Sequence, residues 1–197
     1  MDTARYVVAV AMIITFPPAF LFWFLIHPLV GFWRRTGLAA TYTVNLGIMA
    51  AVGTAIYLNR NRLLEIEFGT HAWLVAAGVV MMGLAAGADA YCKRQLKPAI
   101  LVGVPELRPG SDPGRLLQTG AYAWVRHPRY LAGGLIALSI AMLANYLATW
   151  ILAAACVPVL YLVTVLEERE LVDRFGDDYR AYQQRVPRII PHSLPRR

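Results

Sequence analysis

Long apolar stretches alternate with short polar ones along this chain. A helix needs roughly 20 apolar residues to cross a bilayer, and five stretches reach or nearly reach that length; they span residues 6–30, 38–58, 72–91, 130–146 and 147–166. The pattern predicts an all-α integral membrane protein with five transmembrane helices. No glycine-rich strand-turn-helix signature is present, so we expect no Rossmann domain.

The composition agrees with this fold class. Of the 197 residues, 58% are hydrophobic and only 16% are charged, which is too apolar for an ordinary soluble domain. The two cysteines, Cys92 and Cys156, have neither the spacing of a metal site nor that of a redox pair. We therefore predict a single membrane domain over residues 1–197, with no metal site.

The basic residues predict which helix ends face the cytoplasm. With five spans and the C-terminus inside, every Lys and Arg except Arg5, Arg60 and Arg62 falls on a cytoplasmic segment. The positive-inside rule favours this arrangement. The net charge of +7 then follows from topology and from attraction to anionic lipid headgroups. Membrane lipids are the expected partners, and a nucleic acid is not needed.

Four segments make up the expected domain. They are the first three spans (1–91), a cytoplasmic loop (92–127), a helical hairpin of spans four and five (128–166), and a cytoplasmic amphipathic helix with a tail (167–197). The loop is long and rich in Pro and Gly, so it either caps a functional site or connects two helices.

The amphipathic helix is predicted over residues 168–186. Its apolar side chains recur at steps of three and four, which places them on one face; they are Leu171, Phe175, Tyr179, Tyr182 and Val186. Such a helix lies on the membrane, covers a site, or packs on the protein surface. The pattern alone leaves these alternatives open.

Two polar clusters flank the predicted hairpin. Arg126, His127 and Pro128 precede it, and Glu167 and Glu168 follow it. The hairpin returns the chain to the side that it left, so we expect both clusters at one membrane face. Arginine snorkels and proline is favoured in the first turn of a helix, so the first cluster alone has a structural explanation.

The glutamate pair is harder to explain by structure alone. Both carboxylates lie near the predicted end of a helix, where the helix dipole disfavours negative charge. We expect a cation to offset them, either Arg126 and Arg129 or a positively charged ligand.

Both clusters belong to a longer motif. It runs Leu116-Leu117-x-Thr119-Gly120-x-Tyr122-x-x-Val125-Arg126-His127-Pro128-x-Tyr130 and continues as Glu167-Glu168-x-x-Leu171-x-x-x-Phe175-Gly176-x-x-Tyr179-x-x-Tyr182-x-x-x-Val186-Pro187-Arg188. This motif closely resembles the isoprenylcysteine carboxyl methyltransferase family, whose superfamily also contains the phospholipid N-methyltransferases. The first three spans share only their hydrophobicity with that family.

The resemblance implies a membrane-embedded methyltransferase that uses S-adenosylmethionine without a Rossmann domain. In that family the cofactor lies in a cytoplasmic pocket, and a tunnel opens to the lipid for the acceptor. Backbone groups around His127 are expected to bond the adenine edge, and Glu167 to meet the ammonium group or the ribose hydroxyls. Carried over by motif position, the cofactor-binding residues are Leu116, Leu117, Gly120, Tyr122, His127, Pro128, Tyr130 and Glu167.

The resemblance constrains the acceptor less than the donor. The prenylcysteine enzymes carry an arginine about one helical turn before the glutamate pair, whereas residues 161–166 here contain no cation. A carboxylate acceptor needs desolvation and a cation such as Arg126, whereas an amine must lose a proton to a base such as Glu168 or His127. Arg126 and Glu168 are therefore the candidate catalytic residues.

Three hypotheses for the function follow. The first is methylation of a lipophilic, membrane-borne carboxylate, as in prenylcysteine O-methylation. The alternative is a phospholipid N-methyltransferase. The third is a non-catalytic membrane scaffold, or a membrane reductase on the same helical frame, because sterol reductases also resemble this superfamily.

Overall fold

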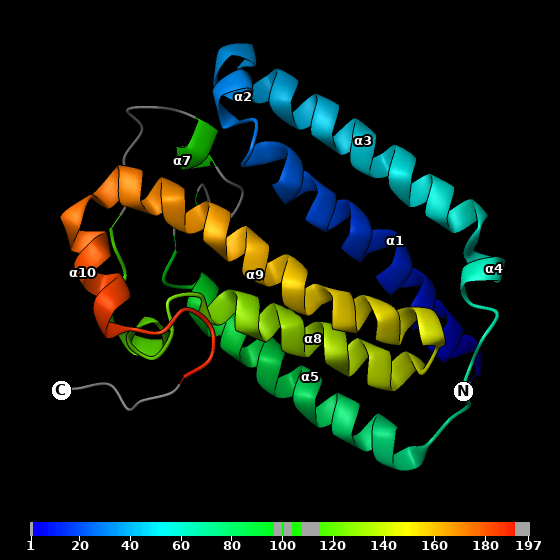
Figure 1. The fold of residues 1–197 in the computed structure, drawn as a ribbon. Helices are drawn as coiled ribbons and strands as arrows, with labels where there is room; N and C mark the ends of the chain where they lie inside the picture. The colour runs from blue at the N-terminus through cyan, green and yellow to red at the C-terminus, as the bar shows by residue number, and fades with distance from the viewer. Residues whose placement is uncertain (1, 97–99, 101–103, 108–114, 192–197) are drawn as a thin grey trace.

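The fold is described from a computed structural model, which places residues 2–96, 100, 104–107 and 115–191 (Figure 1). Within these ranges the chain forms helices and no β-strand, apart from an isolated pairing of Glu67 with Tyr146. The helices are α1 (Asp2–Ile26), α2 (Val30–Thr36), α3 (Leu38–Leu58), α4 (Arg60–Leu63), α5 (Ala72–Lys93), α7 (Val104–Leu107), η1 (Gly120–Ala123), α8 (Pro128–Ala144), α9 (Leu147–Phe175) and α10 (Asp177–Arg185).

Four of these helices, α1, α3, α5 and α9, are long and apolar enough to cross a membrane. The all-α membrane fold predicted from the sequence is thus confirmed. The fourth predicted span corresponds to α8, an apolar helix of 17 residues. At 1.5 Å per residue it measures about 25 Å, against about 30 Å for the hydrocarbon core of a bilayer.

A left-handed residue ends α8. Asn145 has a φ of 54°, and its backbone N–H donates to Ala141 O at 2.8 Å. Its side chain donates to Gly69 O at 2.9 Å and accepts from Trp150 Nε1 at 3.0 Å. Asn tolerates this conformation better than other non-glycine residues. The chain therefore turns directly from α8 into α9 and forms the tight hairpin.

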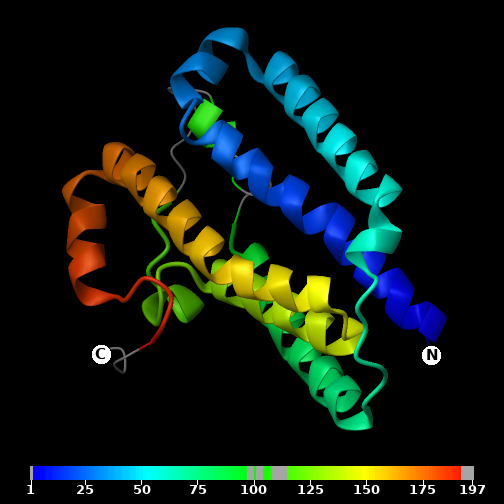
Figure 2. The same cartoon turned by 45° about the vertical axis from the view of Figure 1, so that its right-hand side comes forward.

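The helices pack around α8. Helix α5 runs along one side of α8 and α9 along another, while α1 contacts both α8 and α9 (Figures 1 and 2). A Cβ atom at Gly78 of α5 would lie 3.1 Å from Ser139 O of α8, so glycine permits this close approach. Helix α3 packs mainly on α1 and lies at the edge of the bundle.

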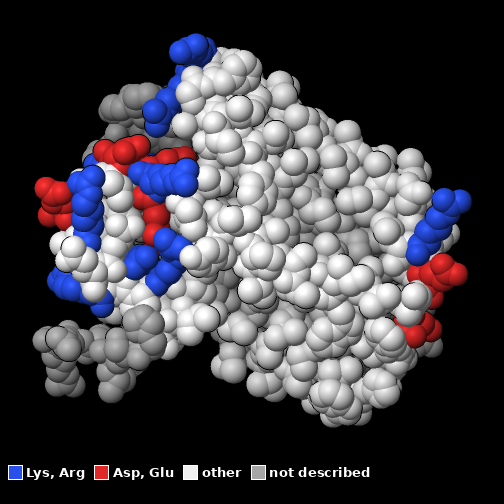
Figure 3. All heavy atoms as spheres, viewed as in Figure 1, with Lys and Arg blue, Asp and Glu red and all other residues white. Residues whose placement is uncertain are grey.

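Charged side chains gather at the ends of the bundle. The face seen in Figure 3 has a broad uncharged middle, with most charges at the end where α9 passes into α10 and a few at the opposite end. Helices α2, α7 and α10 all lie at the first of these ends (Figure 1). An uncharged belt between charged ends is expected of helices embedded in lipid.

The interfacial helix predicted over residues 168–186 is wrong in its bounds. Helix α9 continues through the glutamate pair to Phe175, and the separate helix α10 follows after Gly176. The residues after 166 are mostly Glu, Arg and Leu, which favour helix, so the apolar span extends without a break. Gly176 then adopts a φ of 57° and ends the helix, which is a glycine role that spacing alone did not reveal.

The cap predicted over residues 92–125 falls partly outside the described residues. Helix α5 continues to Lys93, and the segment over residues 115–127 is described up to the start of α8. Its 3-10 helix η1 lies beside the end of α5. The role of the loop as a cap stays a prediction.

Candidate active site

A cavity of about 210 Å³ lies at the end of the bundle where α9 passes into α10. Its wall comes from the loop before α8, the start of α8, the last turns of α9, helix α10 and the end of α1. Most of the residues predicted from the sequence line this cavity, namely Leu116, Leu117, Tyr122, Arg126, His127, Pro128, Tyr130 and Glu167. Gly120 and Glu168 are not among the lining residues; Glu168 is buried and Gly120 is exposed.

Gly120 supports the wall through its backbone. Its φ is +61°, and a Cβ atom at this position would lie 2.9 Å from Tyr91 Oη on α5. Only glycine adopts this conformation without strain and also avoids the hydroxyl. The turn leads directly into η1, whose Tyr122 faces the cavity.

A backbone pairing fixes the segment before α8. The N–H of Arg126 donates to Pro187 O at 2.9 Å, and the N–H of His127 donates to Arg188 O at 3.0 Å. These two N–H groups are thus used within the protein, so other backbone groups near His127 would have to bond the adenine edge, and that contact stays a prediction. His127 is instead the N-cap of α8, and Pro128 begins the helix at a position that suits its fixed φ.

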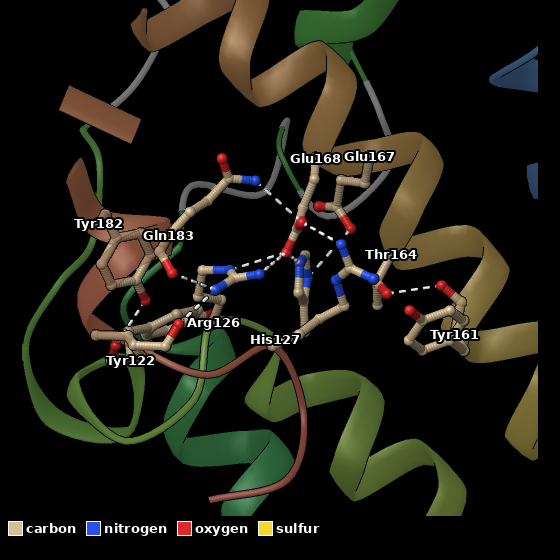
Figure 4. A network of polar contacts seen from close by, with 11 residues as sticks. Tyr122, Arg126, His127, Tyr161, Thr164, Glu167, Glu168, Tyr182 and Gln183 are labelled. Carbon is tan, nitrogen blue, oxygen red and sulfur yellow. Dashed lines mark hydrogen bonds and ion pairs between the residues drawn. The ribbon is translucent and has the colours of Figure 1, made fainter. Parts of the chain in front are cut away.

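Glu168 lies at the centre of a buried polar network (Figure 4). Its side chain is 4% exposed. Oε1 accepts from Arg126 Nε at 2.8 Å and lies 3.1 Å from His127 Nε2. Oε2 accepts from Arg188 at 2.8 Å and from Gln183 at 3.1 Å. Both carboxylate oxygens are therefore satisfied by the protein, which makes burial of this charge tolerable.

The cation expected beside the glutamates is Arg126. Its Nη2 lies 2.8 Å from Glu168 Oε1, and its Nη1 donates to the carbonyl oxygens of Gln183 and Val186. Arg129 also lines the cavity but pairs with another residue, with its Nε 3.3 Å from Asp89 Oδ1 on α5. Arg126 thus ties the loop before α8 to α9 and to the segment after α10.

Two buried polar atoms beside the cavity have no hydrogen-bond partner among the described residues. One is Oε2 of Glu167, which lies 3.7 Å from His127 Nδ1, and the other is the hydroxyl of Tyr179. Tyr179 is only 2% exposed, and both residues line the cavity. An unsatisfied buried polar group costs about 1–3 kcal/mol. Two such groups around one cavity are typical of a ligand site.

Three tyrosines contribute aromatic rings and hydroxyl groups to the wall. They are Tyr122, Tyr179 and Tyr182, and the hydroxyl of Tyr182 donates to Tyr122 O at 2.6 Å. Burial raises the pKa of all three phenols, so they stay neutral and act as hydrogen-bond donors. Of the five residues predicted on one apolar face, Leu171, Phe175, Tyr179 and Tyr182 line the cavity, whereas Val186 does not.

Residues of α1 complete the wall, and sequence reasoning missed them. Trp23 and His27 line the cavity, and the ring of His27 stacks on that of Trp23 at 5.3 Å between centroids. Nδ1 of His27 lies 2.7 Å from Oε1 of Glu170, one turn beyond Glu167 on α9. The available signal was a histidine at the end of an apolar span, on the same predicted face as the charged clusters.

A family match covers most of the chain. The family described as "Protein of unknown function (DUF1295)" matches residues 29–186. The chain belongs to this family. The matched region contains α2 to α10, and so includes almost all of the cavity wall except the part from α1.

Two curated proteins resemble part of this DUF1295 chain. Methanethiol S-methyltransferase 1 from Bradyrhizobium diazoefficiens is 42% identical over 83 residues, which cover 41% of this chain and 28% of that protein. Protein-S-isoprenylcysteine O-methyltransferase from Schizosaccharomyces pombe is 36% identical over 77 residues, which cover 39% of this chain and 33% of that protein.

The chain spans about a third of the length of these curated relatives. No solved structure matches it. The predicted relation to the isoprenylcysteine carboxyl methyltransferases is confirmed by the family and by these relatives.

Proposed function

We propose that this protein is an integral membrane methyltransferase that transfers a methyl group from S-adenosylmethionine to a lipophilic acceptor. The observation that carries the proposal is the cavity itself, because it combines an aromatic wall with two unsatisfied buried polar atoms, on Glu167 and Tyr179. Both curated relatives are named as methyltransferases, which supports the reaction class.

The residues around the cavity fit the chemistry of this cofactor. Glu167 Oε2 is an acceptor for an ammonium group or a ribose hydroxyl, and the Tyr179 hydroxyl is a donor for a ring nitrogen or a carboxylate. Tyr122, Tyr130 and Pro128 offer flat apolar surfaces to a purine. The cavity is smaller than the roughly 300 Å³ at the low end of small-molecule sites, so side chains must move outward when a cofactor binds.

The protein's part in the reaction is to bind, to orient and to exclude water. S-adenosylmethionine supplies a methyl group on a sulfonium, which is transferred by in-line displacement. Such a step requires reacting atoms held about 3–3.5 Å apart in a dry site. Arg126 and Glu168, the residues predicted as catalytic, act by positioning, because their pair holds the loop before α8 against α9.

The acceptor expected from the sequence is a carboxylate, and the relatives' names add a thiol. Arg126 is the cation expected to hold a carboxylate acceptor. Its N–H groups already donate to Glu168 and to two backbone carbonyls. Methylation of a phospholipid amine and a reductase activity remain the alternative functions predicted from the sequence. Displacement of labelled S-adenosylmethionine by a reduced nicotinamide dinucleotide, and not by S-adenosylhomocysteine, would select the reductase.

The proposal extends to the topology. The cavity and the helix and tail over 167–197 would face the cytoplasm, where the cofactor is found, and the hairpin over residues 128–166 would span the membrane. The loop over 92–127 would close the same face. Modification of single cysteines introduced at exposed Arg180 and exposed Arg62 by an impermeant thiol reagent tests this orientation. Only the Arg62 position should react from outside intact cells.

The experiment that tests the function is methyl transfer by the purified protein in lipid bilayers. Labelled S-adenosylmethionine is supplied together with a prenylcysteine analogue, a long-chain thiol and a total lipid extract in separate reactions. Base-labile label in the analogue indicates a carboxyl methyl ester, whereas base-stable label in the thiol indicates a thioether. Transfer to none of the three would overturn the proposal.

A further inference from the structure

His27 and Glu170 form a buried pair at the edge of the cavity that the proposed function does not yet use. Nδ1 of His27 lies 2.7 Å from Oε1 of Glu170, and the two side chains are 1% and 15% exposed. The imidazole also stacks on Trp23 with an angle of 19° between the rings. His27 is therefore held on one side by a carboxylate and on its face by an indole.

This arrangement is that of an oriented base. When Nδ1 carries the proton that Glu170 accepts, Nε2 carries the lone pair of the neutral imidazole. The carboxylate also stabilises the imidazolium that forms when Nε2 takes up a proton. His27 lines the same cavity as Glu167 and Tyr179, although it lies in the turn after α1, far away in the sequence.

We propose that His27, oriented by Glu170, takes the proton from a thiol acceptor during methyl transfer. The inference rests on the proposed function and names the class of its acceptor. The S–H bond of the acceptor breaks, and its proton moves to His27 Nε2. The acceptor sulfur then forms a bond to the methyl carbon, the bond from that carbon to the donor sulfonium breaks, and a neutral thioether leaves.

The proton and the charges both favour a thiol over the other acceptors. A carboxylate is already ionised at neutral pH and needs no base. An amine would enter as an ammonium ion, beside a wall whose described residues include Arg115, Arg126, Arg129 and Arg174 against the single carboxylate of Glu167, which the proposed function assigns to the cofactor. A thiol enters neutral, so it crosses lipid and an apolar cavity without a large desolvation cost. It then requires the base that His27 and Glu170 provide.

The test compares two lipophilic thiols that differ in acidity. Octanethiol needs a base at neutral pH, whereas para-butylthiophenol is more acidic and ionises largely without one. Wild type, His27→Asn, Glu170→Gln and the control His71→Asn are assayed in lipid bilayers with labelled S-adenosylmethionine. His71 is exposed and lies far along the chain from the cavity residues, so its substitution should change neither rate.

His27→Asn should lower kcat on octanethiol on the order of 100-fold or more, the usual size of general-base catalysis. Its rate on para-butylthiophenol should fall less than tenfold, which also shows that the variant is folded. Glu170→Gln, a change in a positioning residue, should lower kcat on octanethiol with little change in KM and should spare the arylthiol.

Three outcomes overturn the inference. The first is an equal loss on both thiols in His27→Asn and Glu170→Gln, which indicates a structural role. The second is an unchanged rate on octanethiol in His27→Asn. The third is wild-type transfer to a carboxylate but to neither thiol, which leaves the proposed function intact. Transfer to no acceptor at all overturns the proposed function as well.

Discussion

Arg126 and Glu168 form a buried ion pair that joins the loop before α8 to α9. Nε and Nη2 of the arginine each lie 2.8 Å from Oε1 of the glutamate, and the side chains are 9% and 4% exposed. The arginine also donates to the backbone carbonyls of Gln183 in α10 and of Val186 directly after it. The pair therefore connects three parts of the chain at the cavity.

Removing one partner of this pair should destabilise the protein strongly. Glu168→Ala leaves Arg126 buried without its carboxylate, which typically costs ~3–5 kcal/mol. The melting temperature in detergent should fall by several degrees. As a control, Arg180→Ala removes a largely exposed pair with Asp177 and should change the melting temperature little. Equal effects of the two substitutions would contradict the role assigned to Glu168.

Tyr179→Phe separates stability from binding. The Tyr179 hydroxyl is buried and lacks a partner among the described residues, so its removal should leave the ligand-free protein equally or more stable. The affinity for S-adenosylmethionine should fall by about fivefold if the hydroxyl bonds the cofactor, since a net hydrogen bond is worth about 1 kcal/mol. Equilibrium binding of labelled cofactor measures this loss.

Tyr182→Phe is the matched control for that variant. The Tyr182 hydroxyl already donates to Tyr122 O, so its removal should lower the melting temperature and affect the cofactor only indirectly. We thus expect Tyr182→Phe to lower the melting temperature, and Tyr179→Phe, on the same helix, to leave it unchanged or raise it. Reduced stability and full affinity in Tyr179→Phe would show that its hydroxyl serves the fold.

Glu167→Gln should weaken cofactor binding without unfolding the protein. Glu167 contacts the cavity and has one oxygen without a hydrogen-bond partner in the described structure, whereas Glu168 carries the buried network. Loss of the charge should lower the affinity for S-adenosylmethionine by tenfold or more, since hydrogen bonds to charged groups contribute about 1.5–3 kcal/mol. Isothermal titration in detergent measures it, and unchanged affinity argues against the assignment.

Gly120→Ala should perturb the cavity wall through the backbone. The substitution places a Cβ atom 2.9 Å from Tyr91 Oη at a φ of +61°, and the left-handed conformation alone costs about 1–2 kcal/mol for a non-glycine residue. Combining it with Tyr91→Phe removes the clash but leaves the backbone strain. The double variant should therefore recover part of the lost melting temperature. Full recovery would show that the backbone conformation is not strained.

Local pattern predicted the hairpin and the two clusters. The two apolar runs meet at residues 145–147, so their flanking clusters had to come together, and Arg126 indeed lies beside Glu168. The apolar lengths also identified α3 with its observed bounds. These features depend on the lengths of apolar runs and on the residues that flank them, both of which can be read from the sequence.

The rest of the site depends on long-range packing. The pairing of Arg126 and His127 with the carbonyls of residues 187 and 188 involves backbone atoms, which carry no sequence signature. The approach of His27 to Glu170 follows from how α1 packs on α9. The end of α9 was misplaced because its charged last turns look like a new helix when hydrophobicity alone sets the boundary.

The central claim is that this cavity supports methyl transfer from S-adenosylmethionine. The most direct measurement is the initial rate of label transfer to lipophilic acceptors in bilayers, by wild type and by Glu167→Gln at matched protein amounts. Wild type should transfer label to at least one acceptor, and the rate in the variant should be at least tenfold lower at low cofactor concentration. Equal rates in the two proteins would contradict the account, as would an absence of transfer from a folded wild type.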